Sequence, residues 1–439
     1  MMSGTTAACI SQSMMIAALP TIMHEYSVSA SLGQLLTTSY IFTLGLISAM
    51  TAYLVHRVDS KKLFIAAMVW LVAPNYPLLL ASRLLQAGGA GIALPLIQVV
   101  ALSVYPKSEY GRAMGLVGLI IGFAPAIGPT VSGFLIDFWG WRSVFVILGA
   151  VSAVVVVLSF FVLSDVVKRE GSRERFDVPS GLLYTLGFCG IMLGTTVMES
   201  DAAFDPVSLA ALAGGALALF VFARRQARIE QPLLKLSCFR NRTFAIATVL
   251  VMMSQMAFMV GSIMVPLFVQ DVQGGSATVS GLTILPGAVL LGFLNPVTGR
   301  LLDRYGPRPL VAVGCAVLAA GTLAFAACDA GTPEWAITVL YGVRTVGVAC
   351  LMMPMTAHAC AALSLEDIAQ GTAIITSFRQ IFGALSSSAL ITVMALASSN
   401  ELGIDVGGFA LSFEVQAAVI VVGFVVGMAF LPRPQRKTR

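Results

Sequence analysis

Three arginines stand inside long apolar stretches of this 439-residue chain: Arg83, Arg344 and Arg379. A charged side chain in an apolar environment costs a few kcal/mol unless it is paired or hydrated, so such residues commonly carry function. Arg344 and Arg379 could each meet an anionic group of a bound molecule or the C-terminal end of a helix. Arg83 has a second interpretation, in which its long side chain simply extends to the edge of the apolar layer.

A second set of residues could carry protons. A proton carrier must titrate in response to its surroundings, which normally requires a semi-buried carboxylate or a histidine. None of the 21 Asp and Glu residues falls at the centre of an apolar run; the candidates are Glu199 and Asp201 as a coupled pair, and His358. Each has an ordinary alternative, namely solvated loop carboxylates and a packed, hydrogen-bonded histidine.

The elements that must hold these residues are helices of membrane-spanning length. Uncharged stretches recur along the whole chain, and a helix of about 20 residues crosses a bilayer. Basic residues concentrate in every second gap between the stretches, and Arg142 is the one basic residue in the other gaps. This alternation follows the positive-inside rule. We therefore expect a multi-pass protein of the plasma (inner) membrane with both termini in the cytoplasm.

The composition agrees with this topology, because 58% of the residues are hydrophobic and only 11% are charged. The net charge of +5 lies in short loops, so it is a topological signal rather than a nucleic-acid-binding surface. The seven cysteines show no CxxC spacing, which favours packing residues over metal ligands or disulfides. No P-loop, metal-ligand cluster or nucleophile–base pattern is present. We expect no enzymatic activity, no cofactor, no metal, no ATP and no nucleic-acid partner.

The length rule predicts an all-α fold of about fourteen transmembrane helices. Two long charged connections, 168–177 and 224–242, bracket a pair of these helices. We expect three parts, which are an N-terminal six-helix bundle, an inserted transmembrane pair with its cytoplasmic linkers, and a C-terminal six-helix bundle with a basic tail. Their ranges are 1–164, 165–243 and 244–439. Leucines at 233, 234 and 236 predict that part of the second connection lies on the membrane surface as an amphipathic segment.

The third span, expected over 63–80, is short. Only 63–73 is cleanly apolar before Pro74, which gives about 17 Å of helix against a hydrocarbon core of about 30 Å. The helix incorporates its prolines, or it spans a thinned bilayer, or the sequence has lost about two turns. A crossing is still required, because the basic gaps on either side must share one face.

Three short patterns combine small residues, prolines and charges at fixed spacing. One opens the fourth helix, expected over 83–104, with Arg83, Gln86 and Gly89. Another lies in the fifth helix, and its glycines and prolines suit a helix that bends and packs closely; it comprises Gly122, Pro125, Gly128, Pro129 and Gly133. The third lies between the tenth and eleventh helices, where an aspartate beside arginines could latch one face; it comprises Gly299, Asp303, Arg304 and Gly306.

These patterns resemble motifs of the major facilitator superfamily, and the second is similar to the motif of its exporters. The whole chain looks like the fourteen-helix drug:H+ antiporter branch, the multidrug efflux type; further matching positions are Leu19-Pro20, Pro266-Leu267 followed by Gln270, and Phe378-Arg379-Gln380 with Gly383. The resemblance implies two six-helix bundles and proton-driven export of amphipathic or cationic compounds by alternating access. It rests on motifs spread over nearly the full length.

Two positions depart from that pattern. Ser11 stands where the branch usually has an aspartate in the first helix, so proton coupling is implied by the resemblance alone. The N-terminal copy of the loop pattern, 52–61, has lost both glycines and its first aspartate, which predicts a weak latch there.

The cargo path is indicated by flexible and polar residues of the ninth and twelfth helices: Met252, Gln255, Met256, Met259 and Arg344. Thioethers suit an adaptable apolar surface, although methionines at helical spacing also pack against neighbours or face lipid. The sequence therefore predicts an exporter of amphipathic drugs or toxic metabolites. Two alternatives stay open, an exporter of one endogenous lipid or organic anion and a non-transporting, sensor-like relative.

Overall fold

The computed structural model describes residues 2–26, 28, 30–57, 75–162, 177–201, 206–229, 232–397 and 405–431. All regular secondary structure in these residues is helical, which confirms the all-α class. The long helices are α1 (Met2–Tyr26), α2 (Ala30–Arg57), α4 (Tyr76–Val104), α5 (Tyr110–Trp139), α6 (Arg142–Val162), α7 (Val178–Asp201), α8 (Pro206–Gln226), α9 (Arg242–Leu267), α10 (Ala277–Tyr305), α11 (Pro307–Ala326), α12 (Glu334–Ala361), α13 (Ile368–Ala397) and α14 (Val406–Phe430).

Eight helices of the described part are long and apolar enough to cross a membrane: α4 and α8 to α14. Shorter apolar helical stretches lie in α2, α6 and α7, at Ser39–Thr51, Arg142–Leu158 and Val178–Gly194. These findings support a multi-pass membrane protein.

The expected boundary between the third and fourth spans was wrong. Residues 77–80, expected in the third span, belong to the first turns of α4, which starts seven residues before the expected Arg83. The Asn75 side chain accepts a hydrogen bond from the Leu78 amide and so caps the helix. Pro77 lies in the first turn, where a missing amide hydrogen costs little. The rest of the expected third span lies outside the described residues.

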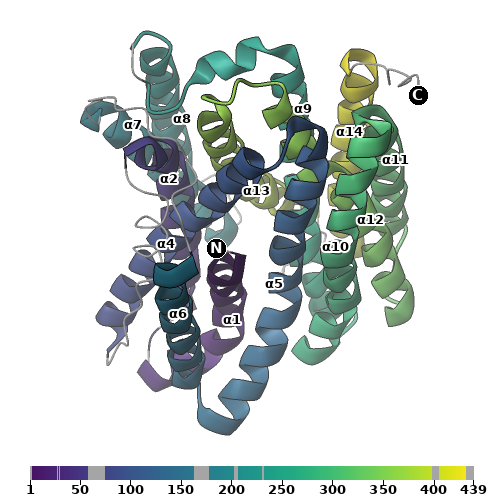
Figure 1. The fold of residues 1–439 in the computed structure, drawn as a ribbon. Coiled ribbons are helices and arrows are strands. Elements are labelled where there is room, and N and C mark those ends of the chain that lie inside the picture. Colours follow the sequence, from purple (N-terminus) through teal and green to yellow (C-terminus); the bar gives the residue numbers. More distant parts are fainter. Residues whose placement is uncertain are drawn as a thin grey trace.

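The helices form two groups that meet along α5 and α10. Helices α1, α2, α4, α5 and α6 pack among themselves, and so do α9 to α14 (Figure 1). Between the groups, α5 contacts α10 and α12, while α13 contacts α2 and α4. We call the top of the bundle in Figure 1 the upper end; it contains residues 105–110, 300–308 and 361–368.

Helices α7 and α8 form a closely packed pair at the outer edge of the bundle (Figure 1). A Cβ added at Gly190 would lie 2.8 Å from the Ala211 carbonyl oxygen, so these two backbones approach each other as closely as small residues permit. Helix α7 also packs against α2 of the first group and α13 of the second. The pair therefore covers part of the seam between the two groups.

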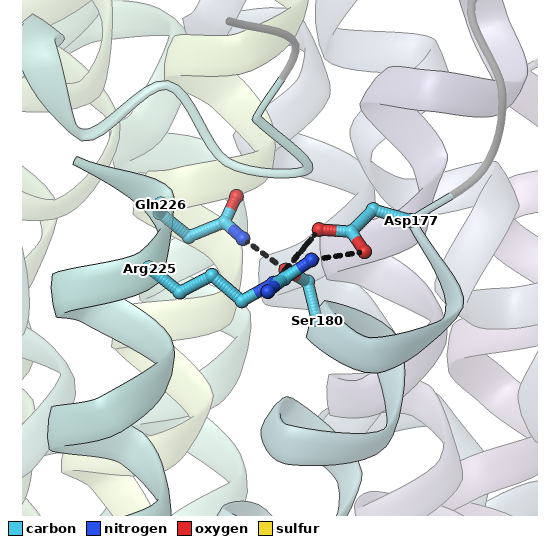
Figure 2. A network of polar contacts seen from close by, with 4 residues as sticks. All are labelled: Asp177, Ser180, Arg225 and Gln226. Carbon is cyan, nitrogen blue, oxygen red and sulfur yellow. Dashed lines mark hydrogen bonds and ion pairs between the residues drawn. The ribbon is translucent and has the colours of Figure 1, made fainter. Parts of the chain in front are cut away.

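A polar network ties the upper ends of α7 and α8 together. Figure 2 shows Arg225 and Gln226 of α8 directed at Asp177 and Ser180 at the start of α7. The guanidinium of Arg225 donates to both carboxylate oxygens of Asp177, at 3.1 and 3.2 Å, and Gln226 donates to the Ser180 hydroxyl at 2.7 Å. Burial alone would raise the pKa of Asp177, but the hydrogen bonds from Arg225 and Ser180 bring that pKa below its ordinary value of 3.8.

The linker from α8 to α9 packs into the protein rather than along the membrane surface, contrary to the amphipathic-segment expectation. Leu233 and Leu234 are buried in the largest apolar cluster. The Leu234 amide donates to Gln226, and the Lys235 ammonium pairs with Asp367 at 2.7 Å. The Asp367 carboxylate raises the pKa of Lys235. Through these bonds the α7–α8 pair is attached to the start of α13.

Replacing Arg225 by Gln should lower the thermal stability of the purified protein more than replacing the neighbouring Arg224 by Gln. The Arg225 bond is partly exposed, so solvent screening limits the expected loss to on the order of 1 kcal/mol. Because the folded pKa of Asp177 is lowered, its contribution is present above the ordinary pKa of 3.8 and is lost as the pH falls through the lowered value. Melting curves of both variants at neutral pH provide the measurement, and equal melting temperatures would contradict the role of this network.

Candidate functional site

The interface of α5 and α10 is lined by small residues on both sides. On α5 they are Gly111, Gly115, Gly118 and Gly122, a spacing that places all four on one helix face. A Cβ at Gly115 would lie 2.7 Å from the Asn295 carbonyl oxygen and 2.9 Å from the Pro296 Cα. These contacts involve backbone atoms, which cannot move aside as a side chain can. Glycine is therefore required for the two helices to come this close.

Helix α10 presents a matching face to α5. Gly292 packs against Gly122, whose added Cβ would lie 2.8 Å from the Gly292 amide nitrogen. Asn295 donates its side-chain amide to the Gly118 carbonyl at 2.8 Å. Phe123 and Phe293 meet edge to face, with ring centroids 4.9 Å apart. Backbone, hydrogen-bond and ring contacts thus run continuously along the upper part of this helix pair.

Asp303 caps the start of α5 from the neighbouring group of helices. Its two carboxylate oxygens accept hydrogen bonds from the backbone amides of Gly111 and Arg112, at 2.8 and 2.7 Å. These amides have no partner within their own helix, and the N-terminal end of a helix dipole favours a negative charge. The carboxylate therefore closes the upper end by binding a helix terminus, rather than by pairing with the arginines of its own loop pattern.

Basic residues surround this contact. An open cavity of about 400 Å³ at the upper end is lined by Arg112, Arg300, Asp303 and Arg304. Gly306 ends α10 at a φ of 80°, a conformation that favours glycine. On the other side, the Lys107 ammonium donates to the Leu363 carbonyl at 2.8 Å and the Ala361 carbonyl at 3.4 Å, at the C-terminal end of α12. Lys107 and Asp303 thus make two separate links between the groups.

Arg83 lies buried between α1, α2 and α4, with 1% of its surface exposed. One terminal nitrogen, Nη1, donates to Gln86 Oε1 at 2.9 Å and to Ser11 Oγ at 3.1 Å. The guanidinium stacks on the Tyr40 ring, 4.2 Å from its centroid. The structure thus brings together Ser11 and the first two residues of the fourth-helix pattern. It also excludes the interpretation that Arg83 reaches the edge of the bundle.

Arg344 is buried as well, and two of its three guanidinium nitrogens make hydrogen bonds. Its Nε donates to Thr322 at 3.2 Å, while its Nη2 donates to the Ala257 carbonyl at 3.1 Å and to Gln416 Oε1 at 2.6 Å. The rings of Phe325 and Phe413 lie 5.5 and 4.9 Å from the guanidinium carbon. This environment joins α9, α11, α12 and α14, and it favours a structural role over contact with cargo.

The remaining cargo-path residues spread over several surfaces of α9. Gln255 and Met259 face α13, because a Cβ at Gly383 would lie 3.2 and 3.4 Å from their Cγ atoms. Met256 is buried and Met252 is half-buried. Arg379 of α13 is 5% exposed, and its guanidinium is close enough to the Cys9 thiol of α1 for electrostatic interaction. Of the sequence-predicted residues, Gln255 thus packs within the second group, and Arg379 lies near Cys9 of the first group.

The candidate proton carriers are described only in part. Glu199 and Asp201 lie in the last turn of α7, and Pro125, Pro129 and Gly133 lie in α5; the surroundings of these five residues are outside the described part of the structure. His358 is half-buried in the last turn of α12, and its Nε2 atom has no hydrogen-bond partner among the described residues. Gly128 and Gly89 are buried within α5 and α4.

Several residues of this site were not singled out from the sequence. They are Gly111, Gly115, Gly292, Asn295 and Lys107. The glycines carried a usable signal, since small residues repeat at three- and four-residue intervals on both helices. The sequence carried no signal for Asn295 and Lys107, because their hydrogen-bond partners are backbone carbonyls more than 150 positions away.

Comparison with known proteins identifies the family. Residues 1–387 match the Major Facilitator Superfamily. The chain is a member of this superfamily of transporters. Among solved structures, it resembles the proton:xylose symporter XylE with a TM-score of 0.65 at 14% identity, covering 98% of this chain and 94% of the other. It resembles the human organic anion transporter MFSD10 with a TM-score of 0.69 at 12% identity, covering 97% of both chains. At these identities the likeness concerns the fold.

Sequence relatives include bacterial transporters and resistance proteins. The chain is 35% identical to YcnB of Bacillus subtilis, an uncharacterized MFS-type transporter, over 99% of this chain and 94% of the relative. It is 31% identical to the lincomycin resistance protein LmrB of the same species, over 86% of this chain and 81% of the relative. It is 28% identical to a multidrug resistance protein B homolog of Mycobacterium tuberculosis, over 83% and 69%.

Asp303→Asn should loosen the upper end of this superfamily member. Asparagine lacks the charge and can accept only one of the two amide bonds, and a hydrogen bond to a charged group contributes about 1.5–3 kcal/mol. Spin labels at the exposed positions Ser108 and Leu365, one in each group, should report longer and broader distances, in a background without the seven native cysteines. Glu366→Gln is the control, because it removes an exposed carboxylate near the same end. Unchanged distances in the Asp303 variant would refute the latch.

Proposed function

We propose that this transporter exports amphipathic drugs or toxic metabolites in exchange for protons, by alternating access. In this proposal, residues 1–164 and 244–439 form the two six-helix bundles of a fold of about fourteen helices. Residues 165–243 add a helix pair. The upper end faces the cytoplasm of a plasma membrane, as the basic loops suggest.

The observation that carries the proposal is the α5–α10 interface with its Asp303 cap. The two helix groups are joined at one end by backbone packing at glycines and by a few hydrogen bonds, which can break and form again. Such a contact has two stable arrangements, packed or parted, which is the property that alternating access requires. The described geometry then corresponds to a state closed toward the cytoplasm.

The drug cargo is supported by the names of the relatives. Proteins called lincomycin resistance, multidrug resistance and methylenomycin A resistance proteins all align over more than four-fifths of this chain. A broad apolar cargo also agrees with the flexible side chains of Met256 and Met259 on α9.

A second candidate, export of an organic anion, is favoured by the charges inside the bundle. Arg83, Arg344 and Arg379 are all at least 95% buried, whereas the buried part of the described residues contains no carboxylate. Interior cations without interior carboxylates favour a negatively charged or carboxyl-bearing cargo.

The first experiment measures proton movement in everted membrane vesicles when cargo is added. Proton release on addition of a cationic dye supports drug:proton exchange, and a response only to amphipathic carboxylates supports the second candidate. Silence with both cargo classes, from protein that is correctly inserted, would overturn proton-coupled export.

Replacement of the proton-carrying group should abolish this proton signal. We expect at least one of Glu199→Gln, Asp201→Asn and His358→Gln to remove substrate-dependent proton movement, because exchange needs a group that gains and loses a proton. Dye binding to the purified variants serves as the folding control. Wild-type proton movement in all three variants would eliminate these candidates.

A single methyl group at Gly115 should reduce export strongly. Gly115→Ala places a Cβ against the backbone of α10, and overpacking of this kind costs about 1–3 kcal/mol. Gly149→Ala in α6 is a matched control, since a Cβ there meets nothing within 4 Å. Dye efflux from cells with equal amounts of each variant provides the measurement. Equal efflux by the two variants would show that close α5–α10 packing is not part of the transport cycle.

A further inference from the structure

The surroundings of Arg83 contain more hydrogen-bond donors than acceptors. Of its three guanidinium nitrogens, only Nη1 has partners; Nε and Nη2 are buried without any among the described residues. These two nitrogens form one edge of the guanidinium plane, the edge that binds a carboxylate with two parallel hydrogen bonds. The side-chain nitrogen of Gln86 is also buried and has no partner in the described part of the chain. Its oxygen already accepts from Arg83, so this amide is oriented with its donors free.

The described residues supply no negative charge to balance Arg83. Helices α1, α2, α4 and α13 contain one acidic residue in total, Glu25, in the last turn of α1. Glu25 lies fourteen positions after Ser11, which is about 21 Å along a helix. It already accepts hydrogen bonds from Trp141 and Arg142. The buried guanidinium of Arg83 is therefore left with a hydroxyl, a backbone carbonyl, an amide oxygen and the Tyr40 ring.

A second buried cation approaches the same region from the other group of helices. Arg379 of α13 lies near Cys9 of α1, and Cys9 packs against the cluster that contains Tyr40. The Nε atom of Arg379 also lacks a partner among the described residues. Arg344 differs in degree: two of its nitrogens make three bonds and two phenylalanine rings flank it, so only Nη1 lacks a partner among the described residues. Two of the three buried arginines, Arg83 and Arg379, thus lie on elements that meet where α13 packs on α2 and α4.

We propose that Arg83, together with Ser11 and Gln86, binds an anionic group at the seam between the two helix groups. The free guanidinium edge and the Gln86 amide supply donors for a carboxylate or for an inorganic anion such as chloride, and Arg379 adds positive charge from the opposite side. The anion is either part of the cargo or a separate ion. The cargo alternative rests on the proposed export function, whereas the binding site itself does not.

The deciding comparison is Ser11→Asp against Ser11→Asn. Aspartate places a carboxylate beside the Arg83 guanidinium and so occupies the site from within, while asparagine has nearly the same shape and no charge. The purified protein is titrated with chloride and with benzoate at constant ionic strength, and the melting temperature reports binding. Gel filtration establishes that each variant is folded.

We expect chloride or benzoate to raise the melting temperature of the wild type and of Ser11→Asn at similar concentrations. Ser11→Asp and Arg83→Gln should bind roughly 10- to 100-fold more weakly, which corresponds to the loss of hydrogen bonds to a charged group. The folded Arg83→Gln protein keeps the test decisive even where Ser11→Asp does not fold. An equal response in the wild type and Arg83→Gln, or no response to either anion in folded wild type, would overturn the site.

The two sources of the anion give different results. If benzoate binds and chloride competes with it, the site accepts a carboxylate, as a cargo group would require. If chloride binds and benzoate does not displace it, the site holds an inorganic ion. Transport is measured separately in vesicles. Anion binding in a protein that moves no cargo would therefore retain the site and reject the export function.

Discussion

The backbone contact between α5 and α10 is the constraint on which the rest of this structure depends. Helices with ordinary side chains pack with their axes 8–10 Å apart, and only glycine at the contact allows a closer approach. The pairing of Gly115 with Asn295 and Pro296 leaves no room for a single added carbon. It also brings the Asp303 carboxylate within reach of the first amides of α5. The close packing of α5 on α10 and the Asp303 cap therefore support each other, because both fix the position of α5 along α10.

Two buried polar side chains of this structure, Asn295 and Arg83, differ in how they are bonded. Toward the upper end, the Asn295 side-chain amide donates across the seam to the Gly118 carbonyl. Between α1, α2 and α4, two nitrogens of the almost completely buried Arg83 have no partner among the residues that the structure describes. A buried charge without a counter-charge is costly, so its persistence needs a compensating partner. An anion bound at the seam would provide that partner, and it would link cargo or ion binding to the separation of the two helix groups.

The α7–α8 pair has a place in this scheme because it contacts both groups. Its own polar network, centred on Arg225 and Asp177, continues through Gln226 and the linker to Lys235 and Asp367 at the start of α13. Helix α13 also carries Arg379. The pair is therefore bonded to the start of α13 at its upper end, and its helix α7 packs on both α13 and α2.

The sequence by itself determined the helical class, the membrane location and the superfamily, because these follow from apolar length, composition and motifs of local spacing. It also marked Arg83, Asp303 and the glycines of α5 as unusual. Tertiary structure decided what those residues touch. Asp303 binds helix amides rather than nearby arginines, Arg344 bonds to groups of α9, α11 and α14, Ser11 contacts Arg83, and the leucines after α8 pack inward. The partners of Asp303, Ser11 and Gln416 in these contacts are more than 70 positions away in the sequence, so their distances are fixed only when the helices pack.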